Sequence, residues 1–391
     1  MKLLHILTTL DVGGAEMHVL TQVRGQVARG HTVRVAYLLG AGTLAADFSA
    51  AGATVLPCIG KGLGAIWRLR KQLAWCQIAH SHLLRADFVA AAAAWVFRKR
   101  KRLISGKHND ERALLRPMVS RVHGIIGSVP AKTIVLSDHV GRFIEEHGRV
   151  PRSKQERIYY GIDPKPWAQA AQAARAEGGL ERRKIRAEFG FEPDDVVMIC
   201  VARFAPQKAH EVLLKAFAKA REQFPKEEWS PKLRLLLVGD DPFFGYRPKA
   251  EAVARELGLI DSAACVFTGI RRDVPALIAA SDIFTMASRW EGLGLVFLEA
   301  MAAGLPVLST QVSAIPEVVQ DGVHGRLVPA DDVEALTAGM LELCLDIDKR
   351  EIWGGAGSRW VQDVFGLDRM VDETLTVYAD VARDAGLLEP R

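Results

Sequence analysis

The stretch Ser288-Arg-Trp-Glu291-Gly-Leu-Gly-Leu-Val-Phe-Leu-Glu299-Ala-Met-Ala-Ala-Gly304-Leu-Pro306 decides the fold, and it contains two glutamates eight residues apart. Glu291 lies in a glycine-rich loop that follows the apolar run 283–287, and Glu299 lies inside the helix that this loop begins. The glycine and proline at the end of the stretch stop the helix, and a second apolar run follows. The order strand, loop, helix, strand predicts a parallel α/β unit, in which ligands bind at the carboxyl ends of the strands.

The spacing of the two glutamates favours contact with an extended ligand. At ~1.5 Å per helical residue, the two carboxylates can lie on the order of 10 Å apart. That distance is wide for two carboxylates that flank one scissile bond, but it fits the two ends of a nucleotide-diphosphate sugar. The free backbone N–H groups at the start of the helix form a natural binding site for phosphate. The alternative is an ordinary solvated helix, on which such a pair is common.

The composition is that of a globular protein with two domains. The chain has 391 residues, of which 49% are hydrophobic and 25% charged. Its five cysteines form no C-x-x-C pair, which favours free thiols in a reducing, cytoplasmic compartment and argues against a zinc site. The apolar start, residues 1–10, lacks a small-residue cleavage site and predicts a first strand rather than a signal peptide. The longest charge-free apolar run, 88–97, is too short to span a bilayer.

Basic residues are concentrated in the first half of the chain. Residues 1–162 contain 24 Lys and Arg against 10 Asp and Glu, a net charge of +14, whereas the remainder contains 27 against 36. The densest basic run is Arg98–Arg102, and a second basic and apolar stretch covers residues 61–75. Such clusters bind the anionic inner surface of a membrane or form solvated helix ends, and the sequence leaves both interpretations open. No motif for binding nucleic acid accompanies the charge.

Alternation of apolar strands with helical stretches predicts two doubly wound parallel sheets. We expect a first domain over 1–163, a helical linker over 164–190, a second domain over 191–358 and a helical segment over 359–391. The strands predicted for the first domain are 3–8, 32–38, 54–57, 78–81, 103–105, 124–127 and 133–136; those for the second are 196–202, 234–239, 265–268, 283–286, 306–309 and 325–328. A final helical stretch is predicted from 352 to 385.

Several candidate binding residues follow directly after predicted strands. Gly13 and Gly14 come after the first strand, where glycine allows the backbone to approach a ligand at a helix start; an ordinary tight turn is the alternative. Arg203 leaves a strand of the second domain, and Lys208 begins the next helix. A planar guanidinium and a compact ammonium together suit a diphosphate.

Further polar positions follow other strands. Gly239, Gly269 and Arg271 are candidates for shaping a pocket whose backbone reads a base, or for plain polar turns. His80 and His82 could hold a metal, but no third ligand with suitable spacing is apparent, so no metal site is predicted. His108 is the preferred histidine for a hydrogen bond to a sugar hydroxyl.

These motifs together resemble the retaining glycosyltransferases of family 4, which have the GT-B fold. The resemblance rests on Gly13-Gly14, His108, Tyr160-Gly161-Ile162-Asp163, Arg203 with Lys208, Leu237–Asp240, Phe267–Gly269, Ser288 and, above all, Glu291 to Pro306. It covers nearly the whole chain. It implies two Rossmann-like domains facing across a cleft, with a C-terminal helix that crosses back to the first domain.

The resemblance also implies a role for each matching residue. Arg203 and Lys208 would hold the diphosphate and stabilise the leaving charge, and Glu291 would contact the transferred sugar, with His108 near the sugar and the acceptor. Glu299 would bind ribose hydroxyls. The backbone of Gly14, Gly294 and Leu295 would contact phosphates, and the backbone around Arg271 would contact the base. No metal cofactor is implied. The chain departs from the family pattern at Ala209, Tyr160 and Leu293, where glycine, asparagine and phenylalanine are usual.

The expected function is therefore the transfer of a hexose, from a UDP-sugar by preference, to a hydroxyl of a glycan or lipid-linked acceptor in cell-envelope polysaccharide or glycolipid synthesis. Two alternatives remain open. One is an epimerase or phosphorylase with the GT-B fold, although no convincing cofactor-anchoring lysine is present for a phosphorylase. The other is a non-catalytic protein that binds nucleotide sugars.

Overall fold

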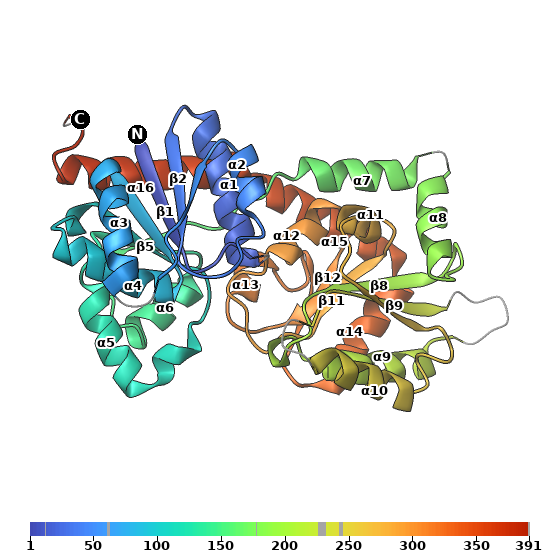
Figure 1. Cartoon of the computed structure of the whole chain (residues 1–391). Coiled ribbons are helices and arrows are strands. Elements are labelled where there is room, and N and C mark those ends of the chain that lie inside the picture. The colour runs from blue at the N-terminus through green and yellow to red at the C-terminus, as the bar shows by residue number, and fades with distance from the viewer. Residues whose placement is uncertain (12, 61–62, 177, 226–231, 242–244, 390–391) are drawn as a thin grey trace. The chain divides into compact units, whose positions relative to one another are not determined.

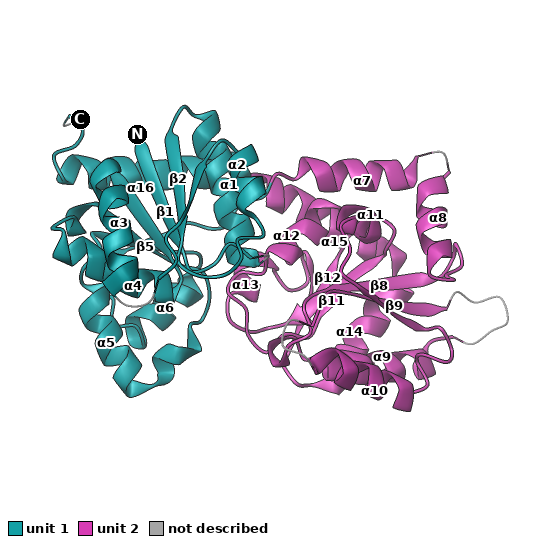
Figure 2. Cartoon of the chain, in the orientation of Figure 1, with its two compact units in different colours: residues 1–162, 365–391 teal, residues 163–364 magenta. Residues whose placement is uncertain are grey.

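The computed structural model describes all residues except 12, 61–62, 177, 226–231, 242–244 and 390–391. The chain divides into two compact units, residues 1–162 with 365–391 and residues 163–364 (Figures 1 and 2). The units differ from the predicted domains in two places. The helical segment 164–190 belongs to the second unit, and the chain returns to the first unit at residue 365 rather than 359.

The first unit is built on a parallel seven-stranded sheet with the order β3-β2-β1-β4-β5-β6-β7. Short runs rich in Val, Ile and Leu form its strands, because both faces of the sheet are covered by helices. The strands are β1 Lys2–Leu7, β2 Thr32–Tyr37, β3 Thr54–Pro57, β4 Ile78–His82, β5 Leu103–Lys107, β6 Lys132–Val135 and β7 Gln155–Arg157.

Alternate residues of these strands enter two separate cores. Leu3 and Leu7 face one core with α1, α2 and α16, whereas Leu4 and Ile6 face the other core with α3, α4 and α5. The period of two along a strand explains this division. The helices of this unit are α1 Gly14–Ala28, α2 Ala45–Ala50, α3 Leu63–Trp75, α4 Leu84–Val96, α5 Pro117–Gly127, α6 Asp138–Glu146 and α16 Leu367–Asp384.

The second unit has a parallel six-stranded sheet with the order β10-β9-β8-β11-β12-β13. Its strands are β8 Val196–Val201, β9 Leu233–Val238, β10 Cys265–Gly269, β11 Ile283–Met286, β12 Val307–Thr310 and β13 Gly325–Val328. Its helices are α7 Lys165–Arg175, α8 Leu180–Glu188, α9 His210–Gln223, α10 Tyr246–Glu256, α11 Val274–Ala279, α12 Leu295–Ala302, α13 Ile315–Val318, α14 Val333–Leu345 and α15 Ile347–Val364. Helices α9, α10 and α14 pack together, as do α7, α11, α12 and α15 (Figure 1).

The structure corrects the predicted elements at three points. The segment 124–127 is the end of helix α5 and not a strand, because a short apolar run suits either structure and Pro117 begins a helix before it. Strand β7 was missed, since its Gln-Glu-Arg sequence has no apolar pattern. The final helical stretch is two helices, α15 and α16, which are separated at Gly366.

The predicted return of the C-terminal helix is confirmed. Met370, Val371 and Tyr378 of α16 are buried in the core that α1 forms with the first sheet. The backbone of Ile162 and Gly366 forms a parallel bridge, which joins the two chain segments of this unit. None of the described helices combines the length and the apolar content needed to cross a bilayer.

Candidate active site

Two adjacent strands at the centre of the second sheet position the predicted diphosphate residues. β8 pairs with β11, and both strands end at the same edge of the sheet. The loop after β8 carries Arg203, which is exposed, and then Lys208. The loop after β11 carries Ser288 and Glu291. The two loops therefore leave the sheet side by side, as expected for a ligand site in an open α/β sheet.

The side chains of Lys208 and Glu291 form an ion pair. The hydroxyl of Ser288 also donates a hydrogen bond to Glu291 Oε1, at 2.7 Å. Only 12% of the Lys208 side chain and 6% of the Glu291 side chain are exposed, so the pair is largely enclosed. A charged pair in such surroundings is costly to break without a replacement partner. An incoming phosphate is such a partner for the ammonium.

Hydrogen bonds along the backbone hold the two loops together. Arg289 N–H donates to the carbonyl of Gln207 at 2.8 Å, and the Gln207 side-chain amide donates to the carbonyl of Trp290 at 2.7 Å. Gln207 was not identified from the sequence, because a glutamine in a loop gives no signal of such a role. The Arg289 guanidinium also donates to the carbonyl of Pro206, at 2.9 Å. Together with the ion pair, these contacts fix the spacing of Lys208 and Glu291.

Helix α12 begins directly beyond the Glu291 loop. Gly294 caps it with φ +80°, and a Cβ at this position would lie 2.5 Å from the Phe297 ring. Glycine is therefore required both by the backbone angle and by the space available. Leu295 is the first residue of the helix, where N–H groups lack carbonyl partners within the helix and favour an anion.

Glu299 lies one turn into α12, eight residues after Glu291. Burial raises the pKa of its carboxyl to about 7, although the side chain keeps partial contact with solvent. A carboxylate in such a position gains from partners that donate hydrogen bonds, as the hydroxyls of a ribose do.

Gly239 and Gly269 come together at the ends of β9 and β10. Gly239 N–H donates to the carbonyl of Gly269 at 3.0 Å, and a Cβ on Gly239 would overlap the carbonyl oxygen of Ala202. The side chain of Arg271 forms ion pairs with Glu188 and Asp273. These ion pairs engage the side chain of Arg271, and contact between its backbone and a base stays a prediction.

In the first unit, Gly13 and Gly14 open helix α1. Gly13 is the N-cap, and a Cβ on it would lie 2.5 Å from Oε2 of Glu16. Gly14 has no heavy atom within 4 Å of the position of a Cβ, so space is open there. Because that oxygen ends a flexible side chain, the close approach at Gly13 does not by itself require glycine, and the open space at Gly14 is compatible with the predicted ligand contact.

His108 is the last of three imidazoles in a buried chain of hydrogen bonds. Its Nε2 lies 2.8 Å from His82 Nδ1, and His82 Nε2 lies 2.9 Å from His5 Nδ1. The other nitrogen of His108 lies 2.5 Å from the hydroxyl of Tyr160. Both ring nitrogens of His108 are thus engaged within the first unit. Direct contact with a sugar stays a prediction, and it would require one of these bonds to be exchanged.

The contact between His5 and Gln26 determines which nitrogen donates in each hydrogen bond of this series. His5 Nε2 lies 2.9 Å from the carbonyl oxygen of the Gln26 side chain, which can only accept. A neutral ring has one donor, so His5 Nδ1 accepts from His82, His82 Nδ1 accepts from His108, and His108 Nδ1 accepts from Tyr160. Burial lowers the pKa of His5 to about 4 and that of His108 to about 3, which keeps these two rings neutral at physiological pH.

The structure places a third histidine, His5, beside His80 and His82, which the sequence did not reveal. Parallel pairing places His5 of β1 opposite His80 of β4, and one ligand nitrogen from each of His5, His80 and His82 lies within 4.8 Å of the others. Glycine is required beside them, because a Cβ on Gly106 would lie 2.7 Å from His80 Nε2. His5 and His82 already bond to each other, so this geometry is that of a hydrogen-bonded cluster.

The fold consists of two Rossmann-like units, and the predicted diphosphate residues lie beside the start of α12 in the second unit. Comparisons with known proteins agree. Residues 12–166 match the model described as glycosyltransferase family 4, and residues 195–346 match the one described as glycosyl transferases group 1. The chain belongs to the family 4 glycosyltransferases of the GT-B fold.

Two curated relatives illustrate the range of the family. The chain is 29% identical over 274 residues to a GDP-mannose-dependent phosphatidylinositol monomannoside mannosyltransferase from Mycolicibacterium smegmatis, covering 67% of this chain and 66% of the relative. It is 30% identical over 201 residues to an N-acetyl-glucosaminyl L-malate synthase from Bacillus anthracis, covering 51% and 50%. The chain thus spans about half to two thirds of the length of these relatives.

Solved structures share the fold over almost the whole chain. The structure of Anabaena HepE with UDP and glucose superposes with a TM-score of 0.83 at 21% identity, covering 97% of this chain and all of that one. A glycosyltransferase from Rickettsia africae gives the same TM-score at 18% identity, with 98% and 99% covered. At these low sequence identities, the structural similarity shows that the fold is shared and no more.

Proposed function

We propose that this protein is a retaining hexosyltransferase. It moves a hexose from a nucleotide-diphosphate sugar to a hydroxyl group of a glycan or lipid-linked acceptor in cell-envelope synthesis. The observation that carries the proposal is the enclosed pair of Lys208 and Glu291 beside the start of α12. This arrangement places a cation and the positive end of a helix next to a carboxylate suited to sugar hydroxyls.

The proposed reaction needs no covalent bond to the protein. The bond between the anomeric carbon and the diphosphate breaks, and the acceptor oxygen bonds to the same face of the sugar. The acceptor proton passes to the departing diphosphate. Lys208, Arg203 and the N–H groups at the start of α12 stabilise the charge that develops on the phosphate, and such electrostatic stabilisation often contributes most to catalysis. Glu291 orients the sugar, and Glu299 holds the ribose.

The nucleotide of the donor is the part of the proposal that experiment must identify. Uridine is the sequence-based expectation, and HepE holds UDP, whereas the mycobacterial relative is named for GDP-mannose. A thermal-shift screen with UDP-sugars and GDP-sugars separates these, because a bound donor raises the melting temperature. A lipid-linked acceptor and a location at the inner face of the cell membrane are part of the proposal.

Substitution of the ion pair tests the chemistry. We expect Lys208→Ala and Glu291→Ala to lower turnover by roughly a hundredfold or more without unfolding the protein, since each removes a group that acts on the transition state. Lys215→Ala, an exposed lysine of α9, is the matched control. Unchanged turnover in Lys208→Ala would contradict the proposal.

The stereochemistry and the absence of a metal requirement are measured on the product. Proton NMR of the early product should show the anomeric configuration of the donor sugar, and inversion would overturn the assignment. Transfer should continue in EDTA, because Lys208, Arg203 and the helix start supply the positive charge that a metal supplies elsewhere. Loss of transfer in EDTA, with recovery on adding a divalent cation, would contradict metal independence.

A further inference from the structure

The side chain of Arg289 contacts three separate segments of the second unit. Its Nε donates to both oxygens of the Asp331 carboxylate, at 2.8 and 3.1 Å, and its Nη2 donates to Glu211 at 2.7 Å. Its Nη1 donates to the carbonyl of Pro206 at 2.9 Å. A guanidinium is planar and carries five N–H donors at fixed angles, so one arginine can hold several acceptors in a set geometry.

The three segments leave the same edge of the second sheet. Pro206 lies in the loop after β8, two residues before Lys208, and Glu211 lies in the first turn of α9. Asp331 lies in the loop 329–332 between β13 and α14. Strands β8, β11, β12 and β13 are neighbours and parallel, so the loops that follow them meet at their carboxyl ends. Arg289 therefore joins the Glu291 loop to the Lys208 loop and to a third loop.

The backbone of Asp331 has an unusual conformation that directs its side chain. Its φ of +58° lies in the left-handed region, which aspartate and asparagine tolerate better than most residues with a Cβ. The next residue, Asp332, caps α14 by accepting from the Ala335 N–H at 2.9 Å. The two aspartates thus have different roles. A strained position whose carboxylate holds an arginine two residues from Glu291 points to a functional constraint.

The ion pairs of Arg289 are partly exposed to water. The exposed fraction of the side chain is 30% for Arg289, 42% for Glu211 and 53% for Asp331. Ion pairs in such surroundings contribute little to stability, because water competes for both partners. The main effect of these contacts is therefore on the position of the loops and not on the free energy of unfolding.

The contact between Lys208 and Glu291 cannot by itself keep the loops in place during the proposed reaction. In the ligand-free protein, the two side chains bind each other. In the proposed complex, the ammonium binds phosphate and the carboxylate binds the sugar, so this bond is exchanged. The partners of Arg289 are a backbone carbonyl and two carboxylates that have no assigned role in donor binding. Its contacts can therefore persist while the donor is bound.

We propose, on the basis of the proposed function, that Arg289 is a positioning residue of the transfer site. It keeps Lys208 and Glu291 at their working spacing while phosphate and sugar occupy them. It touches neither the donor nor the acceptor. Misplacement of a catalytic group by about 1 Å can cost roughly a hundredfold in rate, so a modest shift of these loops has a measurable effect.

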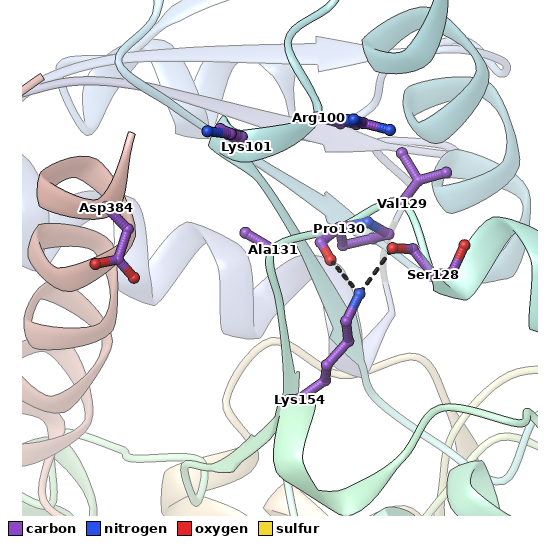
Figure 3. A pocket seen from close by; sticks show the side chains of 8 residues that line it. All are labelled: Arg100, Lys101, Ser128, Val129, Pro130, Ala131, Lys154 and Asp384. Atoms are coloured by element: carbon purple, nitrogen blue, oxygen red, sulfur yellow. Dashed lines mark hydrogen bonds between the residues drawn. The ribbon is translucent and has the colours of Figure 1, made fainter. Parts of the chain in front are cut away.

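Lys154 of the first unit is the same kind of contact without a candidate site beside it. Its ammonium donates to the carbonyls of Ser128 and Pro130, at 2.7 and 3.2 Å, and so holds the loop before β6 (Figure 3). It lines a hollow of about 320 Å³ together with Arg100, Lys101 and Asp384. Among the described residues that line this hollow, none belongs to the candidate active site. Lys154 therefore provides a control for the loss of a cation that holds a loop.

Turnover of substituted proteins tests the proposal. We measure the release of nucleoside diphosphate from the UDP-sugar or GDP-sugar that stabilises the original protein. Arg289→Gln should lower kcat by roughly tenfold, and Arg289→Lys by a similar factor, because a compact ammonium cannot reach all three segments. Asp331→Asn should have a smaller effect, since asparagine keeps an acceptor oxygen and tolerates the left-handed backbone.

Two controls separate positioning from stability. Arg326 pairs with Asp321 and Glu342, and its side chain is 31% exposed, which matches Arg289. Arg326→Gln and Lys154→Gln should keep kcat within about twofold of the original protein, although they change the melting temperature as much as Arg289→Gln does. An equal loss of kcat in either control would overturn the proposal.

A double substitution gives the decisive readout. If Arg289 acts through Lys208, then Arg289→Gln should change kcat by no more than about twofold once Lys208→Ala is present. A role in stability alone would lower kcat by the same factor in both backgrounds and would overturn the proposal. Unchanged kcat in Arg289→Gln, beside an impaired Lys208→Ala, would overturn this proposal and leave the proposed function standing. Unchanged kcat in Lys208→Ala would contradict the proposed function itself.

Discussion

At the scale of single residues, Glu299 gives the protein a pH dependence. Its pKa in the folded, ligand-free protein is about 7, above the usual 4.5, so the carboxyl is protonated at mildly acidic pH. In the proposed role of Glu299, the ionised carboxylate accepts hydrogen bonds from the ribose hydroxyls, whereas the protonated carboxyl accepts less well. Donor affinity should therefore rise by roughly tenfold between about pH 6 and about pH 8.

Calorimetric titration with a nucleoside diphosphate measures this effect. Glu299→Gln should bind more weakly and show a shallower profile in the same range, because only the ionisation of the terminal phosphate then remains. The folding stability of the ligand-free protein changes with pH in the opposite direction to the donor affinity. Because the folded pKa is raised, this group costs stability as pH rises from the unfolded value through 7. A profile unchanged by Glu299→Gln would contradict the assignment.

The histidine chain predicts one tautomer for three rings. His5, His82 and His108 should each be neutral and protonated at Nε2 at about pH 7, because Gln26 fixes the first donor and each ring fixes the next. Nitrogen-15 NMR of histidine-labelled protein reports the protonation of each nitrogen. Replacing Tyr160 by Phe should shift the signals of His108 most. A protonated Nδ1 on His108 would contradict the direction of the chain.

At the scale of elements, the start of α9 stores strain that one substitution relieves. Ala209 has φ +46° and ψ +46°, a left-handed conformation that costs a residue with a Cβ about 1–2 kcal/mol. Glycine avoids most of this strain but loses a buried methyl, so Ala209→Gly should gain about 0.5 kcal/mol of stability. Denaturant unfolding measures it. Ala218→Gly, inside α9, should instead lose about 1 kcal/mol.

The elements show which features the sequence could predict. Twelve of the thirteen strands among the described residues were placed to within two residues at each end, because buried parallel strands are short apolar runs. β7 has no such run, and the predicted strand at 124–127 belongs to α5, where Ile125 is exposed and Ile126 faces the core. A helix with apolar residues on both sides has no clear period, so the pattern misled the prediction.

The sequence could predict those residues of the candidate site that directly follow a strand. Lys208 and Glu291 each follow a strand, and the pairing of β8 with β11 brings them together. His5 and Gln26 were missed, since their contacts arise from lateral pairing of strands and from packing of α1, which a single sequence does not reveal. The substitution of Ala209 for a usual glycine was visible, but its strain was not.

At the scale of the whole molecule, the assignment to one family accounts for both sheets and for the return of α16. The second unit carries the predicted diphosphate residues, and the first unit carries the hydrogen-bonded histidines and the basic run Arg98–Arg102. Residues 1–162 with 365–391 contain 27 Lys and Arg against 16 Asp and Glu, a net +11, whereas residues 163–364 contain 24 against 30, a net −6, so the charge asymmetry follows the division into units.

The most direct measurement is calorimetric binding of UDP and GDP, with the matching nucleosides as references. If Lys208 and the start of α12 hold the diphosphate, the original protein should bind one diphosphate roughly tenfold or more tightly than its nucleoside. Lys208→Ala should remove most of that difference, and Lys215→Ala should not. Glu291→Gln should keep or strengthen diphosphate binding, because it releases the ammonium from its carboxylate partner. Equal diphosphate affinity in Lys208→Ala and the original protein would contradict the account.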